Sequence, residues 1–191
     1  MGFGRIQVIW FVIIIILAAA FGPISRMVPT PRERRLTALR LKARTSGLIV
    51  EIRRLAYANP KPEHRVSSGG KLRDASRDCA AYSLILENNP REIPGWLLLR
   101  FDGEQASVAF SPVSGWKLDK YLTLPAVFWL EVEQILGTLP KDSLAVEVEA
   151  GKVTCYWLES GSIDDVDQDI ETLLHCLQKL KSLIVDEPVR D

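Results

Sequence analysis

The chain has 191 residues, of which 47% are hydrophobic and 25% charged, a composition that excludes a disordered or collagen-like protein. Its 24 basic and 24 acidic residues cancel, yet residues 1–55 carry ten basic and two acidic residues, whereas residues 142–191 carry four basic and twelve acidic ones. Three cysteines without a short paired spacing give no sign of a disulfide framework. The length suits one domain with a short additional segment.

Residues 6–24 are the most apolar part of the chain, and Gln7 is their only strongly polar residue. At about 1.5 Å per residue, a helix of this length spans roughly the 30 Å hydrocarbon core of a bilayer. We therefore expect a transmembrane signal anchor at residues 6–24 after a short flank at residues 1–5. A cleaved secretory signal is the alternative, because Arg5 precedes the run and residues 18–20 are alanines suited to cleavage.

Basic side chains gather on the C-terminal side of this run, where seven of them follow, against Arg5 alone before it. They are Arg26, Arg32, Arg34, Arg35, Arg40, Lys42 and Arg44. The flank richer in Lys and Arg stays in the cytoplasm. The sequence thus predicts a single-pass protein of the cell inner membrane, with its N-terminus outside and its C-terminal domain cytoplasmic, where the cysteines remain reduced.

The segment after the anchor predicts a basic helix. Thr30 is suited to cap it, Pro31 to its first turn and Glu33 to a capping box, and Gly47 is a natural stop. Because this helix lies next to the bilayer, the seven basic residues are expected either to contact anionic lipid headgroups, at about 1 kcal/mol each, or to serve only as the topology signal. Nucleic acid is not expected as a partner, since no aromatic residues interleave with the arginines.

The remaining sequence alternates strand and turn signals before a long final helix. A strand is expected at residues 48–52, followed by a long polar loop at 57–78. Helices are expected at residues 124–136 and from Ser162 onward, and the apolar stripe of the last helix favours packing on a sheet over a coiled-coil seam. Further strands are expected at residues 81–86, 96–101, 107–110, 145–149 and 153–158, the last two joined by a hairpin turn at Ala150-Gly151.

Together these elements predict an α+β fold, in which an N-terminal transmembrane helix precedes one cytoplasmic domain with a mainly antiparallel sheet packed by helices. The domain is expected to begin with the basic helix and first strand at residues 25–55 and to continue through residues 56–191.

Motifs with known chemistry are incomplete. Gly69-Gly70-Lys71 lacks the earlier glycine and the following Ser or Thr of a phosphate-binding loop. The acidic run beginning at Asp165 lacks the glycine and final glutamate of a calcium loop. His64 and His175 show no spacing to one another or to the cysteines that defines a metal site or a nucleophile–base pair. We expect no catalytic residue, cofactor or metal.

Four consecutive apolar residues, Val127, Phe128, Trp129 and Leu130, are the best indication of a binding surface. They lie on one predicted helix and cannot all face one core, so either both sides of the helix are covered or a patch is exposed for a partner.

A single N-terminal span followed at once by a basic helix, with the segments Pro31-Arg32-Glu33-Arg34-Arg35 and Gly47-Leu48-Ile49-Val50, resembles YajC, the accessory subunit of the bacterial preprotein translocase. This resemblance covers about the first 50 residues. The segments Trp96-Leu97-Leu98-Leu99-Arg100, Gly115-Trp116 and Tyr156-Trp157-Leu158-Glu159-Ser160-Gly161 also look like those of uncharacterised proteobacterial single-span proteins, which implies a fold family without a known activity.

The function expected from these observations is a membrane-anchored cytoplasmic interaction domain. It would bind the bilayer through residues 6–24 and a membrane protein as partner, as an accessory component of an inner-membrane complex. The alternative is a membrane-associated enzyme acting on a small molecule or lipid, at a site that only the fold brings together.

Overall fold

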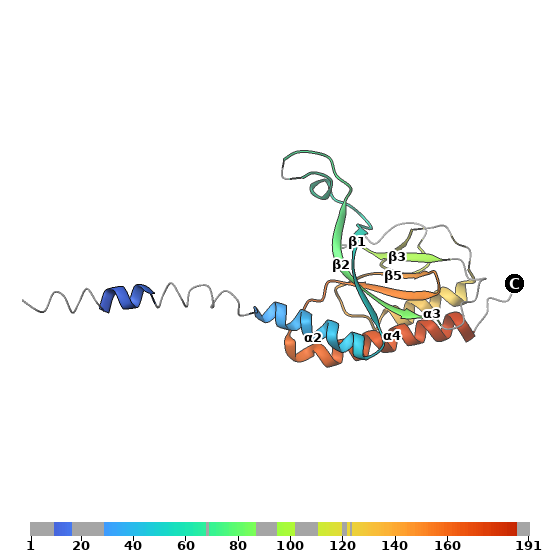
Figure 1. The fold of residues 1–191 in the computed structure, drawn as a ribbon. Helices are drawn as coiled ribbons and strands as arrows, with labels where there is room; N and C mark the ends of the chain where they lie inside the picture. The colour runs from blue at the N-terminus through green and yellow to red at the C-terminus, as the bar shows by residue number, and fades with distance from the viewer. Residues whose placement is uncertain are drawn as a thin grey trace, which may run out of the picture.

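A computed structural model of the chain describes residues 10–16, 29–67, 69–86, 95–101, 111–119, 122 and 124–186. These residues form a six-stranded sheet in the order β1-β2-β6-β5-β3-β4, in which neighbouring strands are antiparallel (Figure 1). The strands are β1 Ile49–Ala56, β2 Ser76–Ile85, β3 Trp96–Arg100, β4 Trp116–Leu118, β5 Ser143–Glu149 and β6 Lys152–Trp157.

Helices cover one face of this sheet, as Figure 1 shows for α2 and α4. Helix α2 is Pro31–Thr45, α3 is Ala126–Leu136, and α4 is Val166–Asp186, which follows the short 3-10 helix η2 Ile163–Asp165. Alternate strand residues such as Tyr82, Leu98 and Trp157 point into this layer and are fully buried. The main hydrophobic core therefore lies between the sheet and the three helices.

Helix α4 supplies the longest apolar stripe of the core. Its side chains at spacings of three and four residues are at most 1% exposed; they are Ile170, Leu173, Leu177, Leu180 and Ile184. They share one cluster with residues of α2, α3 and the sheet. The stripe is thus buried by packing within the domain, as its breadth predicts.

Local sequence signals explain how α2 begins and how β5 and β6 are joined. The Thr30 hydroxyl accepts from the Glu33 N–H, and the Glu33 carboxylate accepts from the Thr30 N–H, which completes the predicted capping box. At the turn between β5 and β6, Ala150 and Gly151 both have positive φ, 50° and 74°. A two-residue turn with positive φ at both positions has a backbone twist that matches the right-handed twist of the flanking strands.

A smaller cluster lies on the opposite face of the sheet. Its large buried members are Leu55, Leu99, Leu144 and Tyr156, and small side chains such as Ala81 and Ala145 complete it. Tyr156 donates from its hydroxyl to Glu147 Oε2 at 2.5 Å. Burial and this hydrogen bond raise the pKa of the Tyr156 phenol well above its ordinary value.

The α+β class and the antiparallel sheet packed by helices are confirmed. Strand β2 begins earlier than expected, so that the long hairpin replaces part of the predicted loop, and β4 is a short strand that the sequence pattern missed. The strand expected at residues 107–110 lies outside the described residues. Within the described ranges, no helix combines the length and the apolar character needed to cross a membrane.

Candidate functional site

The predicted anchor is described at residues 10–16, which are helical. All seven side chains there, from Trp10 to Ile16, are apolar, and their exposed fractions lie between 39% and 71%. The other parts of the predicted span, residues 6–9 and 17–24, lie outside the described residues, as does Arg26. This short helix is the most continuous exposed apolar surface among the described residues.

Arg35 lies on the buried face of α2 and is only 2% exposed. It shares this face with Leu39 and Ala43, since residues four apart lie above one another on a helix. Its guanidinium donates to Asp169 Oδ2 at 2.7 Å and to the backbone carbonyl oxygens of residues 159, 160 and 162. The Arg35 side chain thus ties α2 to the start of α4 and to the segment that precedes it.

That segment, residues 158–162, is shaped around the guanidinium of Arg35. Glu159 has φ +59° and Gly161 has φ +121°, both in the region that L side chains rarely adopt. A Cβ at Gly161 would lie 2.9 Å from Arg35 Nη2. The unusual backbone turns three carbonyl groups toward one side chain, where they accept its hydrogen bonds.

The Glu159 side chain forms a second ion pair beside the first. Its carboxylate is 5% exposed and accepts from Arg40 Nε at 2.9 Å and Arg40 Nη2 at 2.6 Å. The hydroxyl of Tyr82, from β2, donates to Glu159 Oε1 at 2.6 Å. Burial, and then the hydrogen bond to Glu159, raise the pKa of Tyr82 well above its ordinary value, while the bond to Glu159 raises the pKa of Arg40.

Of the other basic residues predicted to contact the membrane, Arg32, Arg34 and Arg44 are exposed on α2 and Lys42 is half-buried. Lys42 pairs with Asp167 of α4 at 2.9 Å, and Arg34 donates to the Pro29 carbonyl oxygen at 3.1 Å. Within the part of the chain that the structure describes, Arg32 and Arg44 form no ion pair. The structure therefore brings Arg35, Arg40 and Lys42 to acids of the domain itself and leaves Arg32, Arg34 and Arg44 facing outward.

Sequence patterns did not predict the acidic partners of these cations. Glu159 and Asp169 lie more than a hundred residues after Arg35, and no local pattern connects them. The position of Arg35 was one indication of a buried role. It stands four residues before Leu39 and eight before Ala43, in line with the apolar stripe of the helix. An arginine on an apolar stripe indicates a buried ion pair with a distant acid.

The four residues proposed as a partner patch divide into two pairs. Phe128 and Trp129 are 7% and 5% exposed and pack edge-to-face around Trp96 at ring distances of 6.5 and 5.7 Å. Val127 and Leu130 point outward and are 63% and 58% exposed. The patch is therefore smaller than the sequence suggests, because its two aromatic rings belong to the core.

A hollow of about 510 Å³ lies between α3 and α4, and its lining begins at Glu131, one helical turn after Val127. Glu131 lines it from α3, and His175 and Lys179 line it from α4. Glu131 follows Val127 by four residues and so lies on the same side of α3. The exposed pair and the hollow together form the α3–α4 surface, which combines apolar side chains with groups of both charges.

No hydrogen bond joins a thiol to a histidine among the described residues, although His175 and Cys176 are neighbours in the sequence. Cys79 and Cys176 donate to the backbone carbonyl oxygens of Arg53 and Ile135. Burial raises the pKa of Cys79 to about 11 and that of Cys176 to about 12, which leaves little thiolate at neutral pH. Burial likewise raises the pKa of Cys155. In the described ranges, no group of three or more His, Cys, Asp or Glu side chains is placed to hold a metal ion.

Comparisons with protein-family models, with curated proteins and with solved structures give no match to this chain. The resemblance of the first 50 residues to YajC stays a prediction.

Proposed function

We propose that this protein is a single-pass membrane-anchored domain that binds a protein partner at the inner membrane. The observation that carries the proposal is the helix at residues 10–16, whose seven consecutive apolar side chains are exposed. Apolar surface in water costs about 25 cal/mol per Å², so a helix of this kind favours a bilayer environment. The longer run at residues 6–24 has the length that a span requires.

The packing of α2 supports a body held close to the bilayer. Arg35, Leu39 and Ala43 of α2 are buried, so the domain begins at this helix. Only a short segment separates the end of the predicted span at residue 24 from Pro31, the first residue of α2. With the basic flank on the cytoplasmic side, the domain would lie in the cytoplasm against the inner leaflet.

The α3–α4 surface supports the binding of a protein partner. Val127 and Leu130 are large apolar side chains with more than half of their surface exposed, next to a hollow lined by Glu131 and Lys179. An apolar centre rimmed by charges of both signs is typical of protein interfaces. The function that best accounts for the anchor and for this surface is that of an accessory subunit. Such a subunit presents the α3–α4 surface to a neighbouring membrane protein.

Membrane insertion is tested by carbonate extraction and by reporters fused to the C-terminus. We expect the full chain to stay in the membrane fraction and a variant without residues 6–24 to be released. A fluorescent reporter should be active and a periplasmic phosphatase reporter inactive. Phosphatase activity without fluorescence would refute the orientation, and carbonate release of the full chain would refute the anchor.

Partner binding is tested by a photocrosslinking amino acid placed at Val127 in intact membranes. The matched control is the same amino acid at Leu41 of α2, which is equally exposed at 63%. We expect a discrete crosslinked product from position 127 that is absent from position 41. The same product should disappear when Leu130 is changed to aspartate. Equal product patterns from both positions would exclude the α3–α4 surface as a specific interface.

A further inference from the structure

Strands β1 and β2 lead into a projection formed by residues 57–67 and 69–75, here called the hairpin lobe (Figure 1). It contains the 3-10 helix η1 Pro62–Arg65. The ring of His64 stacks on Tyr57 at 4.0 Å, and the Arg77 guanidinium lies 4.7 Å from the Tyr57 ring centre. These stacked groups hold η1 against the base of the hairpin and give the lobe a defined shape.

The end of the hairpin lobe carries an exposed apolar pair. Val66 and Leu72 form an antiparallel bridge, flanked by hydrogen bonds from the Arg73 N–H to the Arg65 oxygen and from the Ser67 N–H to the Lys71 oxygen, both 2.9 Å. In such a non-hydrogen-bonded pair the two side chains lie close together on one face. Leu72 is 86% exposed and Val66 is 40% exposed. The pair has no covering layer among the described residues.

The same lobe carries positive charge without acidic partners. Four basic side chains are exposed and form no ion pair within the described part of the chain: Lys61, Arg65, Lys71 and Arg73. Residues 57–75 contain two acids, Glu63 and Asp74. Arg65 and Arg73 lie opposite one another on the hairpin, where like charges destabilise the pairing unless an anion lies between them.

We propose that the hairpin lobe docks on the surface of an anionic lipid bilayer. Leu72 and Val66 would enter the boundary between headgroups and acyl chains, and Arg65 and Arg73 would bind lipid phosphates. A free phosphate ligand would leave the exposed apolar pair without a role. Single-stranded nucleic acid fits less well, because the Tyr57 ring is already stacked on His64 rather than open to a base.

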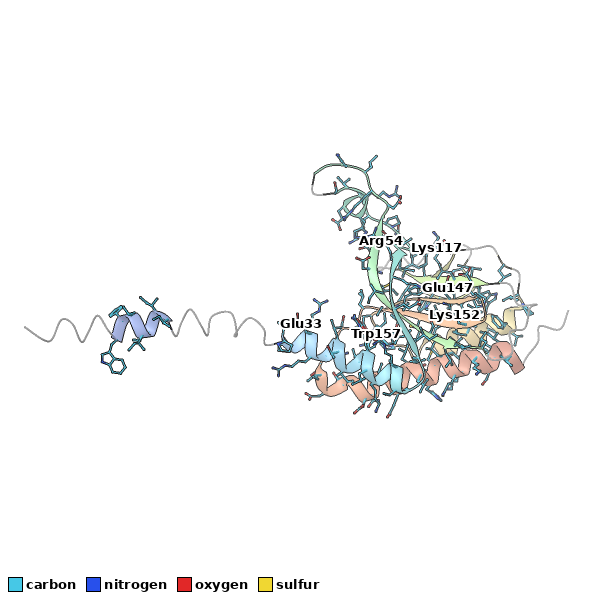
Figure 2. All side chains as sticks on the ribbon, in the orientation of Figure 1. Glu33, Arg54, Lys117, Glu147, Lys152 and Trp157 are labelled. Carbon is cyan, nitrogen blue, oxygen red and sulfur yellow. The ribbon has the colours of Figure 1, made fainter. Side chains whose placement is uncertain are left out.

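The position of the lobe fits this assignment, which rests on the proposed membrane anchoring. In Figure 1 the lobe and the first turn of α2 both lie on the left of the domain, whereas the last turn of α4 lies on the right. Figure 2 shows the side chains of the lobe standing clear of the sheet beyond Arg54, which lies near the base of the projection. In this view a bilayer that faces the N-terminal end of α2 also faces the side of the domain from which the lobe projects.

The test is an environment-sensitive fluorophore attached to the full chain through Leu72→Cys. Its matched control is Gln178→Cys, an exposed position on α4. The three native thiols are buried and have raised pKa values, so labelling at neutral pH is selective for the introduced thiol. Each protein is reconstituted into phosphatidylcholine vesicles with or without phosphatidylglycerol.

We expect the label at position 72 to shift its emission to shorter wavelength in the anionic vesicles only, and high salt to reverse the shift. The label at position 178 should not respond. Changing Arg65 or Arg73 to glutamine should lower the ratio of docked to undocked lobe about fivefold for each charge removed. Equal emission at position 72 in both vesicle types, or a response to an RNA oligonucleotide and not to lipid, would overturn the proposal.

The anchor is judged separately by flotation of the same labelled protein in carbonate. Loss of flotation with a retained lipid response at position 72 refutes the anchor and supports the lobe. Flotation without a response at position 72 refutes the lobe and leaves the anchor intact.

Discussion

Replacing Arg35 with methionine tests whether α2 is fixed by the domain or by the membrane surface. The Arg35 side chain is 3% exposed and pairs with Asp169, which is 24% exposed. Methionine retains an unbranched apolar stem but donates no hydrogen bond to Asp169 or to the three carbonyl groups of the 158–162 segment. The matched control is Arg32→Met on the first turn of the same helix, where the arginine is exposed.

The expected loss is about 3 kcal/mol of unfolding free energy. Removing one partner of a buried ion pair costs about 3–5 kcal/mol, and the partial exposure of Asp169 places this pair at the lower end. The released carbonyl groups of Ser160 and Ser162 lie at the surface and regain water. For a domain of this size, about 3 kcal/mol lowers Tm by roughly 6–12 °C. The Arg32→Met control should stay within about 0.5 kcal/mol of the native chain.

The assay is urea unfolding of the full chain in mild detergent, followed by far-ultraviolet circular dichroism. Adding Asp169→Asn to Arg35→Met should recover part of the loss, because it removes the unpaired carboxylate. Equal stability of the Arg35→Met and Arg32→Met proteins would show that Arg35 does not hold α2 on the domain. That result would return Arg35 to the role of a membrane-surface residue.

Three further predictions concern the same packed region. Gly161→Ala should lower stability by about 1–3 kcal/mol in urea unfolding, because alanine is strained at φ +121° and its Cβ meets the Arg35 guanidinium. Tyr82 has a pKa raised by folding, so its contribution to stability is complete below the ordinary value of 10.0 and declines as pH rises above it; Tyr82→Phe should flatten that alkaline decline. Native thiols should react with a maleimide far more slowly than after denaturation, at Cys79, Cys155 and Cys176.

Each of these predictions has a clear contrary result. A Gly161→Ala protein as stable as Gly115→Ala would refute the steric argument, because Gly115 also has positive φ but has open space at its Cβ. A decline above pH 10 that is identical in the native chain and Tyr82→Phe would exclude Tyr82 as its cause. Rapid labelling of the native chain would show that the thiols are reached without unfolding.

Much of the fold follows from local patterns in the sequence. The capping box at Thr30, the turn at Ala150-Gly151 and the stripe of α4 each depend on residues within one or two turns of one another. Sheet order could not be obtained in this way. Strand β2 pairs with β6, about seventy residues later, and alternation of apolar residues does not specify which strands become neighbours.

The candidate sites likewise combine features that local spacing predicts with features that depend on residues far apart in the sequence. Exposure of Val127 and Leu130 follows from helical spacing once Phe128 and Trp129 are assigned to the core, but the core partner Trp96 lies on a distant strand. The roles of Arg35 and Arg40 depended wholly on distant acids. Charge density alone assigned these arginines to the membrane surface. The positive-inside rule counts basic residues beside an apolar run, and it does not register whether acidic residues of the folded domain neutralise them.

The ion pairs of α2 bring the two oppositely charged regions of the chain together. The basic N-terminal region and the acidic C-terminal region meet where α2 lies beside the start of α4, at the pairs Arg35–Asp169, Arg40–Glu159 and Lys42–Asp167. Neutralisation there stabilises the domain and withdraws those cations from any lipid. Exposed basic side chains that form no ion pair among the described residues include Arg32, Arg34 and Arg44 of α2 and Lys61, Arg65, Lys71 and Arg73 of the hairpin lobe. The proposed membrane contact uses the arginines of the hairpin lobe, so the label at position 72 distinguishes a docked domain from one that is only tethered.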